Sequence, residues 1–255
     1  MTVQSQPHVL AIGEALIDVV ITHEQPECPS EIPGGSPANV ALTLGRLGRP
    51  VALATWFGAD TRGRLIDFHM NDSGVHITPA SRGASHTSTA LARLDENGAA
   101  SYTFDLEWAP TAPIEVPETA QIIEAGSISA IIEPGASAVL DALTRGREHA
   151  LIFFDPNARP SIMGEPAAAL ASLERFIALA DVVKVSDEDI DWLTGGAPST
   201  RSWIVGSAWA SRSWSSRAAS TGATSPRPRD CASRRPRATS RSSTRSARVT
   251  LSWAA

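Results

Sequence analysis

Short apolar stretches alternate along this chain with longer segments in which apolar residues recur every three or four positions. The short stretches, which predict strands, are Val9–Ile12, Val51–Trp56, Gln121–Ala125, Ala150–Phe154 and Asp181–Val185. The longer segments, which predict amphipathic helices, are Ala38–Leu47, Thr61–Asn71, Ala136–Arg145 and Pro166–Ala178. This alternation predicts an α/β fold, in which helices cover both faces of a mostly parallel sheet.

A different pattern lies between these units, where Thr87–Asp95 and Ala99–Trp108 alternate apolar and polar side chains around Asn97-Gly98. Asn-Gly between two alternating segments is the strongest short signal for a β-hairpin. The pattern leaves open whether this hairpin lies at the edge of the main sheet or in a separate element. It also leaves open whether residues 87–89 are ordinary strand residues or contacts to a polar ligand.

Composition narrows the class of protein. The chain has 255 residues, enough for one large α/β domain with a real core, and a formal net charge of −5. Two cysteines, Cys28 and Cys231, provide no disulfide framework and suit a reducing compartment. The apolar run His8–Thr22 contains two acidic residues, and no stretch is long enough to span a membrane. We therefore expect a cytoplasmic protein without a membrane or nucleic-acid partner, since its first part is acidic.

One glycine-rich stretch, Gly-Gly-Ser-Pro-Ala-Asn from Gly34 to Asn39, comes directly before a predicted helix. Two glycines allow the backbone to approach a ligand closely, and Pro37 fixes φ at a helix start near Ala38. Asn39 lies in the first turn, where its amide and free backbone N–H groups can face a polar ligand. For the two glycines alone, an ordinary loop before a core helix is the simpler interpretation.

The whole stretch from Gly34 to Gly48 changes that interpretation, because it resembles the N-terminal signature of the ribokinase-like (PfkB-type) carbohydrate kinases. Other segments follow in the order of that family. Residues 11–18 resemble its opening strand, 58–63 its G-x-D-x-x-G turn, 126–129 a strand end, 155–160 the D-x-N-x-R segment of fructokinase-type members, and 184–189 its K-x-N-x-x-E segment. In the last segment Ser186 replaces Asn and Asp189 replaces Glu. The resemblance covers roughly residues 8 to 197.

The resemblance implies a doubly wound, mostly parallel sheet with a small β-lid that includes residues 87–108. It also implies phosphoryl transfer from ATP, with Mg²⁺, to a sugar hydroxyl, and a homodimer formed by lid strands. The residues it places on the sugar are Asp18, Gly34, Gly35, Asn39, Asn157 and Arg159. Those it places on the nucleotide and the hydrated metal are Lys184, Ser186 and Asp189. The D-x-N-x-R segment favours a fructokinase-like enzyme; kinases of ribose, nucleosides or 2-keto-3-deoxygluconate share most of the motifs.

Each of these side chains also has an ordinary structural interpretation. Asp18 can simply end a strand, and Asn157 and Arg159 can form loop hydrogen bonds or an exposed ion pair. The acidic residues 187 and 188 are typical of a solvated helix start. A sugar-binding module without catalysis therefore remains an alternative to an enzyme.

The last 58 residues, from Pro198 to Ala255, differ in composition from the rest. They contain eleven arginines, no lysine and one acidic residue, so their charge is about +10 (11 − 1) and that of the preceding part about −15. A basic disordered tail that binds nucleic acid is one interpretation. The four tryptophans of this segment argue against it, since disordered segments contain few aromatic residues.

Translation in the wrong reading frame is the second interpretation of this tail. If the third base of each codon is read with the first two of the next, residues 243–254 permit Asp-Thr-Val-Gly-Ala-Gly-Asp-Ser-Phe-Met-Gly. This contains the G-A-G-D loop of the resembled family, whose aspartate acts as the general base. Residues 214–220 permit Val-Val-Thr-Arg-Gly-Glu, which resembles the strand and turn upstream of it. We therefore expect a sugar-kinase portion over residues 1–197, a disordered off-frame tail over 198–255, and no activity in the chain as printed.

Overall fold

The computed structural model describes residues 7–24 and 26–195, so the predicted tail, 198–255, lies outside the described residues. Its centre is a six-stranded sheet with the strand order β12-β11-β10-β1-β4-β6, in which all neighbours run parallel. The strands are β1 Val9–Ile12, β4 Val51–Ala54, β6 Val75–Ile77, β10 Ile122–Gly126, β11 Leu151–Asp155 and β12 Val182–Val183. The predicted mostly parallel sheet is confirmed.

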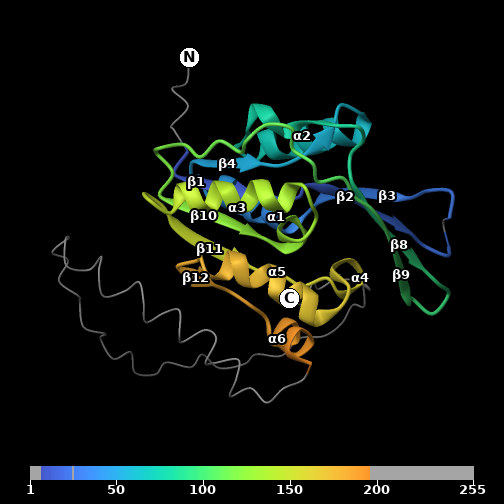
Figure 1. Ribbon diagram of the computed structural model, residues 1–255. Coiled ribbons are helices and arrows are strands. Elements are labelled where there is room, and N and C mark those ends of the chain that lie inside the picture. Colours follow the sequence, from blue (N-terminus) through green and yellow to red (C-terminus); the bar gives the residue numbers. More distant parts are fainter. Residues whose placement is uncertain (1–6, 25, 196–255) are drawn as a thin grey trace, which may run out of the picture.

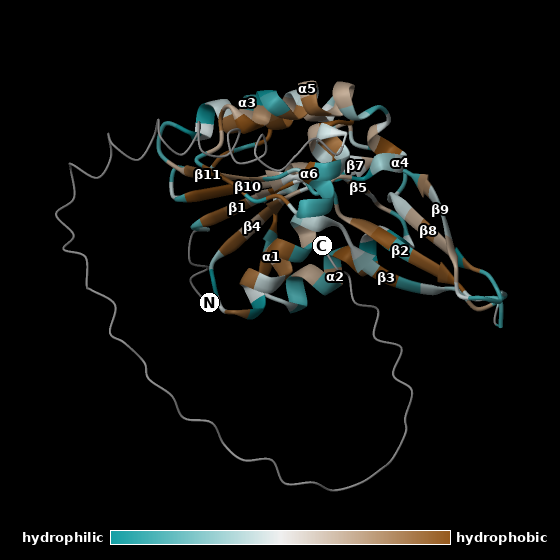
Figure 2. Cartoon of the chain, turned by 90° about the horizontal axis from the view of Figure 1, so that it is seen from below, coloured by the Kyte–Doolittle hydropathy of each residue, from teal (hydrophilic) through white to brown (hydrophobic). Residues whose placement is uncertain are grey.

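Helices cover both faces of this sheet, as Figure 2 shows. The helices α3 (Gly135–Gly146) and α5 (Pro166–Ile177) lie on one face, and α1 (Ser36–Arg46) and α2 (Thr61–Asp72) on the other. Successive strand residues point to opposite faces, so the strands contribute to two separate buried clusters. Burial on both faces is the reason that the strands are continuous apolar runs in the sequence.

A second sheet extends from one end of the main sheet (Figure 1). Its order is β3-β2-β8-β9, with β2 Leu16–Ile21, β3 Ser30–Gly34, β8 Thr89–Leu94 and β9 Ala100–Asp105. Strands β8 and β9 form the predicted antiparallel hairpin, in which Gly98 N–H donates to the carbonyl oxygen of Asp95 at 3.0 Å. The hairpin therefore belongs to a separate sheet, which we call the lid sheet, and not to the edge of the main sheet.

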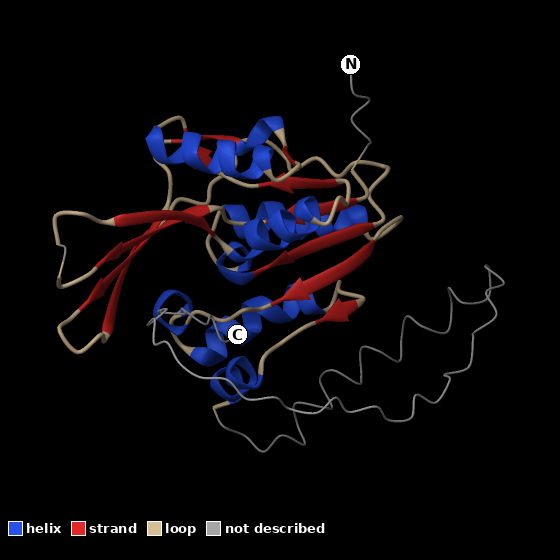
Figure 3. Ribbon diagram, turned by 180° about the vertical axis from the view of Figure 1, so that it is seen from behind, coloured by secondary structure: helices blue, strands red, loops and turns tan. Residues whose placement is uncertain are grey.

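The remaining elements are short, and Figure 3 distinguishes helices, strands and loops. Strand β5 (Phe57–Gly58) pairs in parallel with β7 (Arg82–Ala84). The 3-10 turns η1 (Pro79–Ser81) and η2 (Ser127–Ala130) and the helices α4 (Pro160–Met163) and α6 (Asp187–Thr194) follow β6, β10, β11 and β12 respectively. They therefore begin at the carboxyl ends of parallel strands, where open α/β sheets bind ligands. Within the described residues, no helix is long and apolar enough to cross a bilayer.

Several predicted element boundaries differ from the observed ones, and two of these differences have a structural reason. Residues 11–18, which resemble a single strand that ends at Asp18, hold the last two residues of β1 and the first three of β2, so Asp18 lies inside a lid strand. The chain passes between sheets at Gly13, whose φ is 151° and where a Cβ would lie 2.4 Å from Cγ of Pro37, so only glycine fits. Helix α1 starts at Ser36, two residues earlier than predicted, because Gly35 forms its N-cap.

Candidate functional site

Asp18 and Gly34 lie against each other on two neighbouring strands of the lid sheet. Strands β2 and β3 pair in antiparallel fashion, and a Cβ added at Gly34 would lie 2.2 Å from Oδ2 of Asp18. The carboxylate therefore occupies the space that any side chain at position 34 would need. Burial raises the pKa of the Asp18 carboxyl, and the positive charge of Arg159 opposes that rise. The lid thus presents a half-buried carboxylate near a guanidinium from the main domain.

The turn between β3 and α1 brings the backbone close to the end of β1. Gly35 has a φ of 106°, and a Cβ there would lie 2.4 Å from the carbonyl oxygen of Glu14. Its own carbonyl oxygen accepts a hydrogen bond from Asn39 N–H at 2.9 Å, which closes the first turn of α1. The Asn39 side chain is exposed. These contacts require glycine at position 35 and leave the Asn39 amide free to reach a ligand.

Glu14 is a site residue that the sequence reasoning did not select. Its carboxyl oxygen Oε1 accepts a hydrogen bond from Ser36 N–H, at the start of α1, at 3.2 Å. The residue is only 7% exposed, and burial raises the pKa of the Glu14 carboxyl to about 7, against hydrogen bonds and the charge of Arg159. A glutamate directly after a buried apolar strand was the available signal, but its burial depends on the packing of α1.

Glu124, on β10, is a second acid on this part of the sheet, half-buried as a residue but with one carboxyl oxygen shielded from solvent. Burial raises the pKa of the Glu124 carboxyl to about 8, and the negative charges of Glu14 and Asp155 contribute to the rise. The Oε2 atoms of Glu14 and Glu124 are both shielded from solvent and have no hydrogen-bond partner in the described part of the chain. The sequence did not identify this acid, since a strand position does not show which neighbours will surround it.

The loop after β11 carries the predicted pair Asn157 and Arg159. Asn157 has a φ of 37°, and its N–H donates to Oδ1 of Asp155 at 3.1 Å. Nη1 of Arg159 donates to Oδ1 of Asn157 at 3.0 Å and to the carbonyl oxygen of Ala158 at 2.8 Å. The structure therefore brings Asn157 and Arg159 together, and the positive charge of Arg159 opposes the rise that burial causes in the pKa values of Asp18 and Glu14. The predicted loop hydrogen bonds are present as well.

The predicted nucleotide and metal residues lie on the next connection, after β12. Lys184 is exposed, and its Nζ lies 3.1 Å from Oδ2 of Asp155. Ser186 caps α6, because its Oγ accepts the N–H of Asp189 at 3.1 Å. Asp189 is buried, and its Oδ1 accepts the N–H of Ala158 at 2.9 Å. The Asp189 carboxylate therefore joins α6 to the loop of Asn157 and Arg159.

These donors do not form a metal cage. Among the described residues, no cluster of three or more His, Cys, Asp or Glu side chains is arranged to hold a metal ion. One Asp189 oxygen is occupied by a backbone N–H, and Asp155 is paired with Lys184. Mg²⁺ usually takes one or two carboxylates together with substrate phosphates and water, so such a site does not require a cage of protein ligands.

The G-x-D-x-x-G segment has a structural role in the lid. Asp60 is the N-cap of α2, and its Oδ1 accepts the N–H of Gly63 at 2.8 Å. The same carboxylate accepts the hydroxyl of Thr87 at 2.7 Å and, through Oδ2, the N–H of Thr87 at 2.8 Å. These bonds lower the pKa of the Asp60 carboxyl against a burial effect that raises it. Asp60 therefore anchors the residues that lead into lid strand β8.

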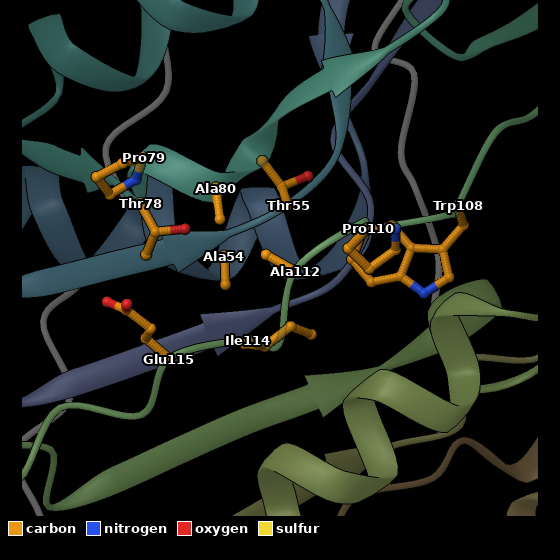
Figure 4. A pocket seen from close by; sticks show the side chains of 10 residues that line it. All are labelled: Ala54, Thr55, Thr78, Pro79, Ala80, Trp108, Pro110, Ala112, Ile114 and Glu115. Carbon is orange, nitrogen blue, oxygen red and sulfur yellow. The ribbon is translucent and has the colours of Figure 1, made fainter.

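A cavity of about 140 Å³ lies apart from these residues, between the end of β4, the turn after β6 and the connection from the lid to β10. Figure 4 shows Thr55, Thr78 and Trp108 from these three segments around it. Its walls are mostly apolar, and Nε1 of Trp108 is already bonded to the carbonyl oxygen of Ser129 at 3.1 Å. None of the predicted site residues lines this cavity.

A second sheet beyond the carboxyl ends of a parallel sheet, with an acid against a glycine turn, is the architecture that the sequence resemblance implies. Comparison with known proteins makes the assignment specific. The sequence model described as "pfkB family carbohydrate kinase" matches residues 6–202. The chain belongs to the pfkB family of carbohydrate kinases.

Similar curated proteins include a fructokinase of Rhizobium leguminosarum bv. trifolii, 32% identical over 194 residues, which cover 72% of this chain and 59% of that protein. A probable chloroplastic fructokinase-6 of Arabidopsis thaliana is 32% identical over 213 residues, or 76% of this chain and 54% of the relative. The chain thus spans less than two thirds of the length of these relatives.

Solved structures give the same family. The fructokinase of Xylella fastidiosa has a TM-score of 0.64 at 30% identity, over 77% of this chain and 68% of that one. The fructokinase of Vibrio cholerae O395, with fructose, ADP and calcium bound, has a TM-score of 0.66 at 26% identity, over 80% and 68%. A sugar kinase of Pyrococcus horikoshii in complex with ATP has a TM-score of 0.65 at 26% identity, over 73% and 66%.

Proposed function

We propose that the protein to which this chain corresponds phosphorylates a hydroxyl of a ketose sugar, with fructose as the first candidate and ATP as the donor. The observation that carries the proposal is the close contact, in the lid sheet, between Gly34 and the Asp18 carboxylate, whose pKa responds to the charge of Arg159 in the main domain. A carboxylate acceptor, Asp18, from one sheet and a guanidinium donor, Arg159, from the other can bind a polar ligand at the carboxyl ends of the parallel strands, where open α/β sheets bind ligands. The fructokinase relatives support the choice of sugar.

Each predicted residue takes a role that its surroundings support. The Asp18 carboxylate accepts hydrogen bonds from sugar hydroxyls, and the backbone at Gly34 and Gly35 approaches the sugar ring. Asn39 is exposed at the first turn of α1 and supplies an amide. Asn157 orients Arg159 through the bond at 3.0 Å, so that the guanidinium can donate to sugar oxygens. Alignment of this kind is most of what phosphoryl transfer requires of a protein.

In this proposal Lys184 and Ser186 bind the nucleotide. A similar solved structure, a sugar kinase in complex with ATP, supports ATP as the donor. Lys184 can place its ammonium group on a phosphate, since its side chain is 57% exposed. Mg²⁺ would arrive with the nucleotide phosphates. Asp189 holds the loop of Arg159 in place through Oδ1, and its other carboxyl oxygen would help to place the hydrated ion. We place the reaction in the cytosol, in keeping with the low cysteine content.

The printed sequence contains no G-A-G-D loop, so we propose that the 255-residue chain binds sugar without phosphorylating it. The general base of the resembled family would then be present only in a frame-restored gene product. Sequencing genomic DNA from codon 190 past the stop tests the frame hypothesis: one inserted or deleted base that restores Gly-Ala-Gly-Asp supports it, and an unaltered frame refutes it.

Titration calorimetry with fructose tests the binding part. We expect saturable binding that weakens about 10- to 100-fold in Asp18→Asn, which loses charge-assisted hydrogen bonds. Asp141→Asn is the matched control, since that carboxylate is exposed on α3. Ribose, nucleosides and 2-keto-3-deoxygluconate in the same experiment identify another kinase of the family if one of them binds more tightly. Equal fructose affinity in both variants would contradict the assigned role of Asp18.

Turnover tests the catalytic part. In a coupled assay with ATP and fructose, we expect no turnover by the 255-residue chain and turnover by the frame-restored protein. Phosphorylation by the printed chain would refute its proposed inactivity. Binding of fructose by both proteins without turnover by either would favour a sugar-binding module without catalysis.

We also propose that the lid sheet forms the interface of a homodimer. Ile32 and Tyr102 lie on the strands β3 and β9 and are 52% and 57% exposed. Exposed apolar side chains on the edge strands of a sheet are typical of an interaction surface. Analytical ultracentrifugation is expected to show a dimer that Tyr102→Glu converts to a monomer, and a monomeric wild-type protein would exclude the interface.

A further inference from the structure

The carboxyl group of Glu14 connects three segments of the proposed sugar site. Oε1 accepts the N–H of Ser36 at 3.2 Å, at the point where the glycine turn becomes α1. Burial raises the pKa of the same carboxyl, and Ser127, after β10, and the positive charge of Arg159 both lower it. Ser127 is buried and has a φ of 59°, a left-handed conformation that is rare for serine. Glu14 therefore contacts the glycine turn directly, and its charge is affected by residues that follow β10 and β11.

The backbone of Glu14 also supports the turn. A Cβ at Gly35 would lie 2.4 Å from the carbonyl oxygen of Glu14, so the two backbones are in close contact. A shift of Glu14 would therefore move Gly35 and the start of α1 together. Glu14 is 7% exposed and does not itself present a surface to a sugar, so it acts on the ligand through the turn.

A second carboxyl group limits the charge of Glu14. Negative charge on Glu14 and on Asp155, on β11, raises the pKa of Glu124, on β10, so the ionised forms of these acids repel one another. The Oε2 atoms of both glutamates are buried without a hydrogen-bond partner in the described part of the chain. The opposing positive groups are Arg159, which acts on Glu14, and Lys184, which is paired with Asp155 at 3.1 Å. Two acids in this arrangement cannot both ionise readily, so they exchange protons with solvent as a pair.

We propose that Glu14 is a positioning residue of the sugar site, and that loss of a proton from the Glu14–Glu124 pair fixes the Gly35–Ser36 turn and strengthens sugar binding. An ionised carboxylate accepts the N–H of Ser36, at the positive end of α1, more strongly than a neutral carboxyl does. Ionisation therefore holds the glycine turn in one place opposite Asp18 and Arg159. This inference rests on the proposed sugar-binding function.

The first readout does not involve sugar. In an NMR pH titration of the 255-residue chain, the Ser36 amide signal is expected to titrate with a midpoint near 7. The titration should vanish in Glu14→Gln, which keeps the shape of the side chain and loses the charge. In Glu124→Gln it should remain with a midpoint at lower pH, because the repelling charge is gone. Glu148→Gln, an exposed position beyond α3, is the control and should titrate like the wild type.

The second readout is fructose affinity over the same pH range. We expect the Kd for fructose to fall about fivefold as pH rises through the midpoint. This is the change expected when one neutral hydrogen bond becomes charge-assisted. Glu14→Gln should keep the weak affinity at every pH, and Glu124→Gln should reach the strong affinity at lower pH. A purely structural role for Glu14 would change affinity equally at all pH values.

The possible results distinguish an error in the assigned role of Glu14 from an error in the proposed sugar-binding function. A Ser36 signal that titrates unchanged in Glu14→Gln overturns the inference, as does a fructose Kd that does not change with pH in the wild type. If Glu14→Gln does not fold, an unshifted midpoint in Glu124→Gln overturns it equally. A titrating Ser36 signal in a protein that binds none of the sugars tested refutes the proposed function and supports the coupling of Glu14 to the turn.

Discussion

Replacement of Glu124 by glutamine should stabilise the protein, and increasingly so as pH rises. The residue is half-buried as a whole, but its Oε2 atom is shielded from solvent and has no hydrogen-bond partner in the described structure. Burial raises the pKa of this carboxyl from 4.5 to about 8. Between these two pH values the folded protein keeps a proton on Glu124 that the unfolded chain releases. Glu124 therefore does not reduce the free energy of unfolding below pH 4.5, and reduces it increasingly as pH rises toward about 8.

The size of the stability change follows from the difference between the pKa values of Glu124 in the folded and unfolded chain. Each pH unit between the two pKa values reduces the free energy of unfolding by about 1.4 kcal/mol. At neutral pH the cost of Glu124 is about 3 kcal/mol, and at pH 5 it is below about 1 kcal/mol. Glutamine is neutral at every pH, so Glu124→Gln should add about 2 to 3 kcal/mol at neutral pH and little at pH 5. For a domain of this size, that corresponds to an increase in Tm of about 5 to 10 °C.

Urea unfolding of the wild type, Glu124→Gln and the control Glu148→Gln at a series of pH values between 5 and 8 measures this difference. The gain of Glu124→Gln over the wild type should grow with pH, and that of the control should stay constant near zero. A gain that is the same at both ends of the series would refute the reasoning, because it would show that Glu124 does not retain its proton in the folded protein.

Three further changes test other contacts. Asp60→Ala removes the N-cap of α2 and both bonds to Thr87, and should lower the free energy of unfolding by about 2 kcal/mol in denaturant titrations. Gly34→Ala places a Cβ 2.2 Å from an Asp18 oxygen, so calorimetry should show lost fructose binding, and unchanged affinity would contradict the close approach. Leu151 is 43% exposed on β11, and Leu151→Thr should leave Tm nearly constant while reducing binding of a hydrophobic dye.

Much of the fold could be predicted from local pattern, because a buried parallel strand and an amphipathic helix each have their own periodicity. Strand β1 was predicted at its observed bounds, Val9–Ile12. The boundary errors arose where tertiary packing decides the path of the chain. At Gly13 the chain passes from one sheet to the other, and only glycine fits there because Pro37, remote in sequence, packs against it. The pattern also left open whether the Asn97-Gly98 hairpin joined the main sheet, since hairpin signals are local and sheet membership is not.

The candidate site shows the same division. Local residue patterns predict the alternation of strands and helices and the glycine turn before α1, since these depend on residue types at short spacing. The grouping of Asp18 with Arg159 comes from the resemblance to carbohydrate kinases, because the two residues are far apart in the chain. Folding alone brings Glu14 close enough to raise the pKa of Glu124, and brings the Asp189 carboxylate to the backbone of the loop that carries Arg159. The physical reason is that burial and charge act through space: a carboxyl group acquires a raised pKa from whatever surrounds it after folding, and those neighbours come from strands far apart in the chain.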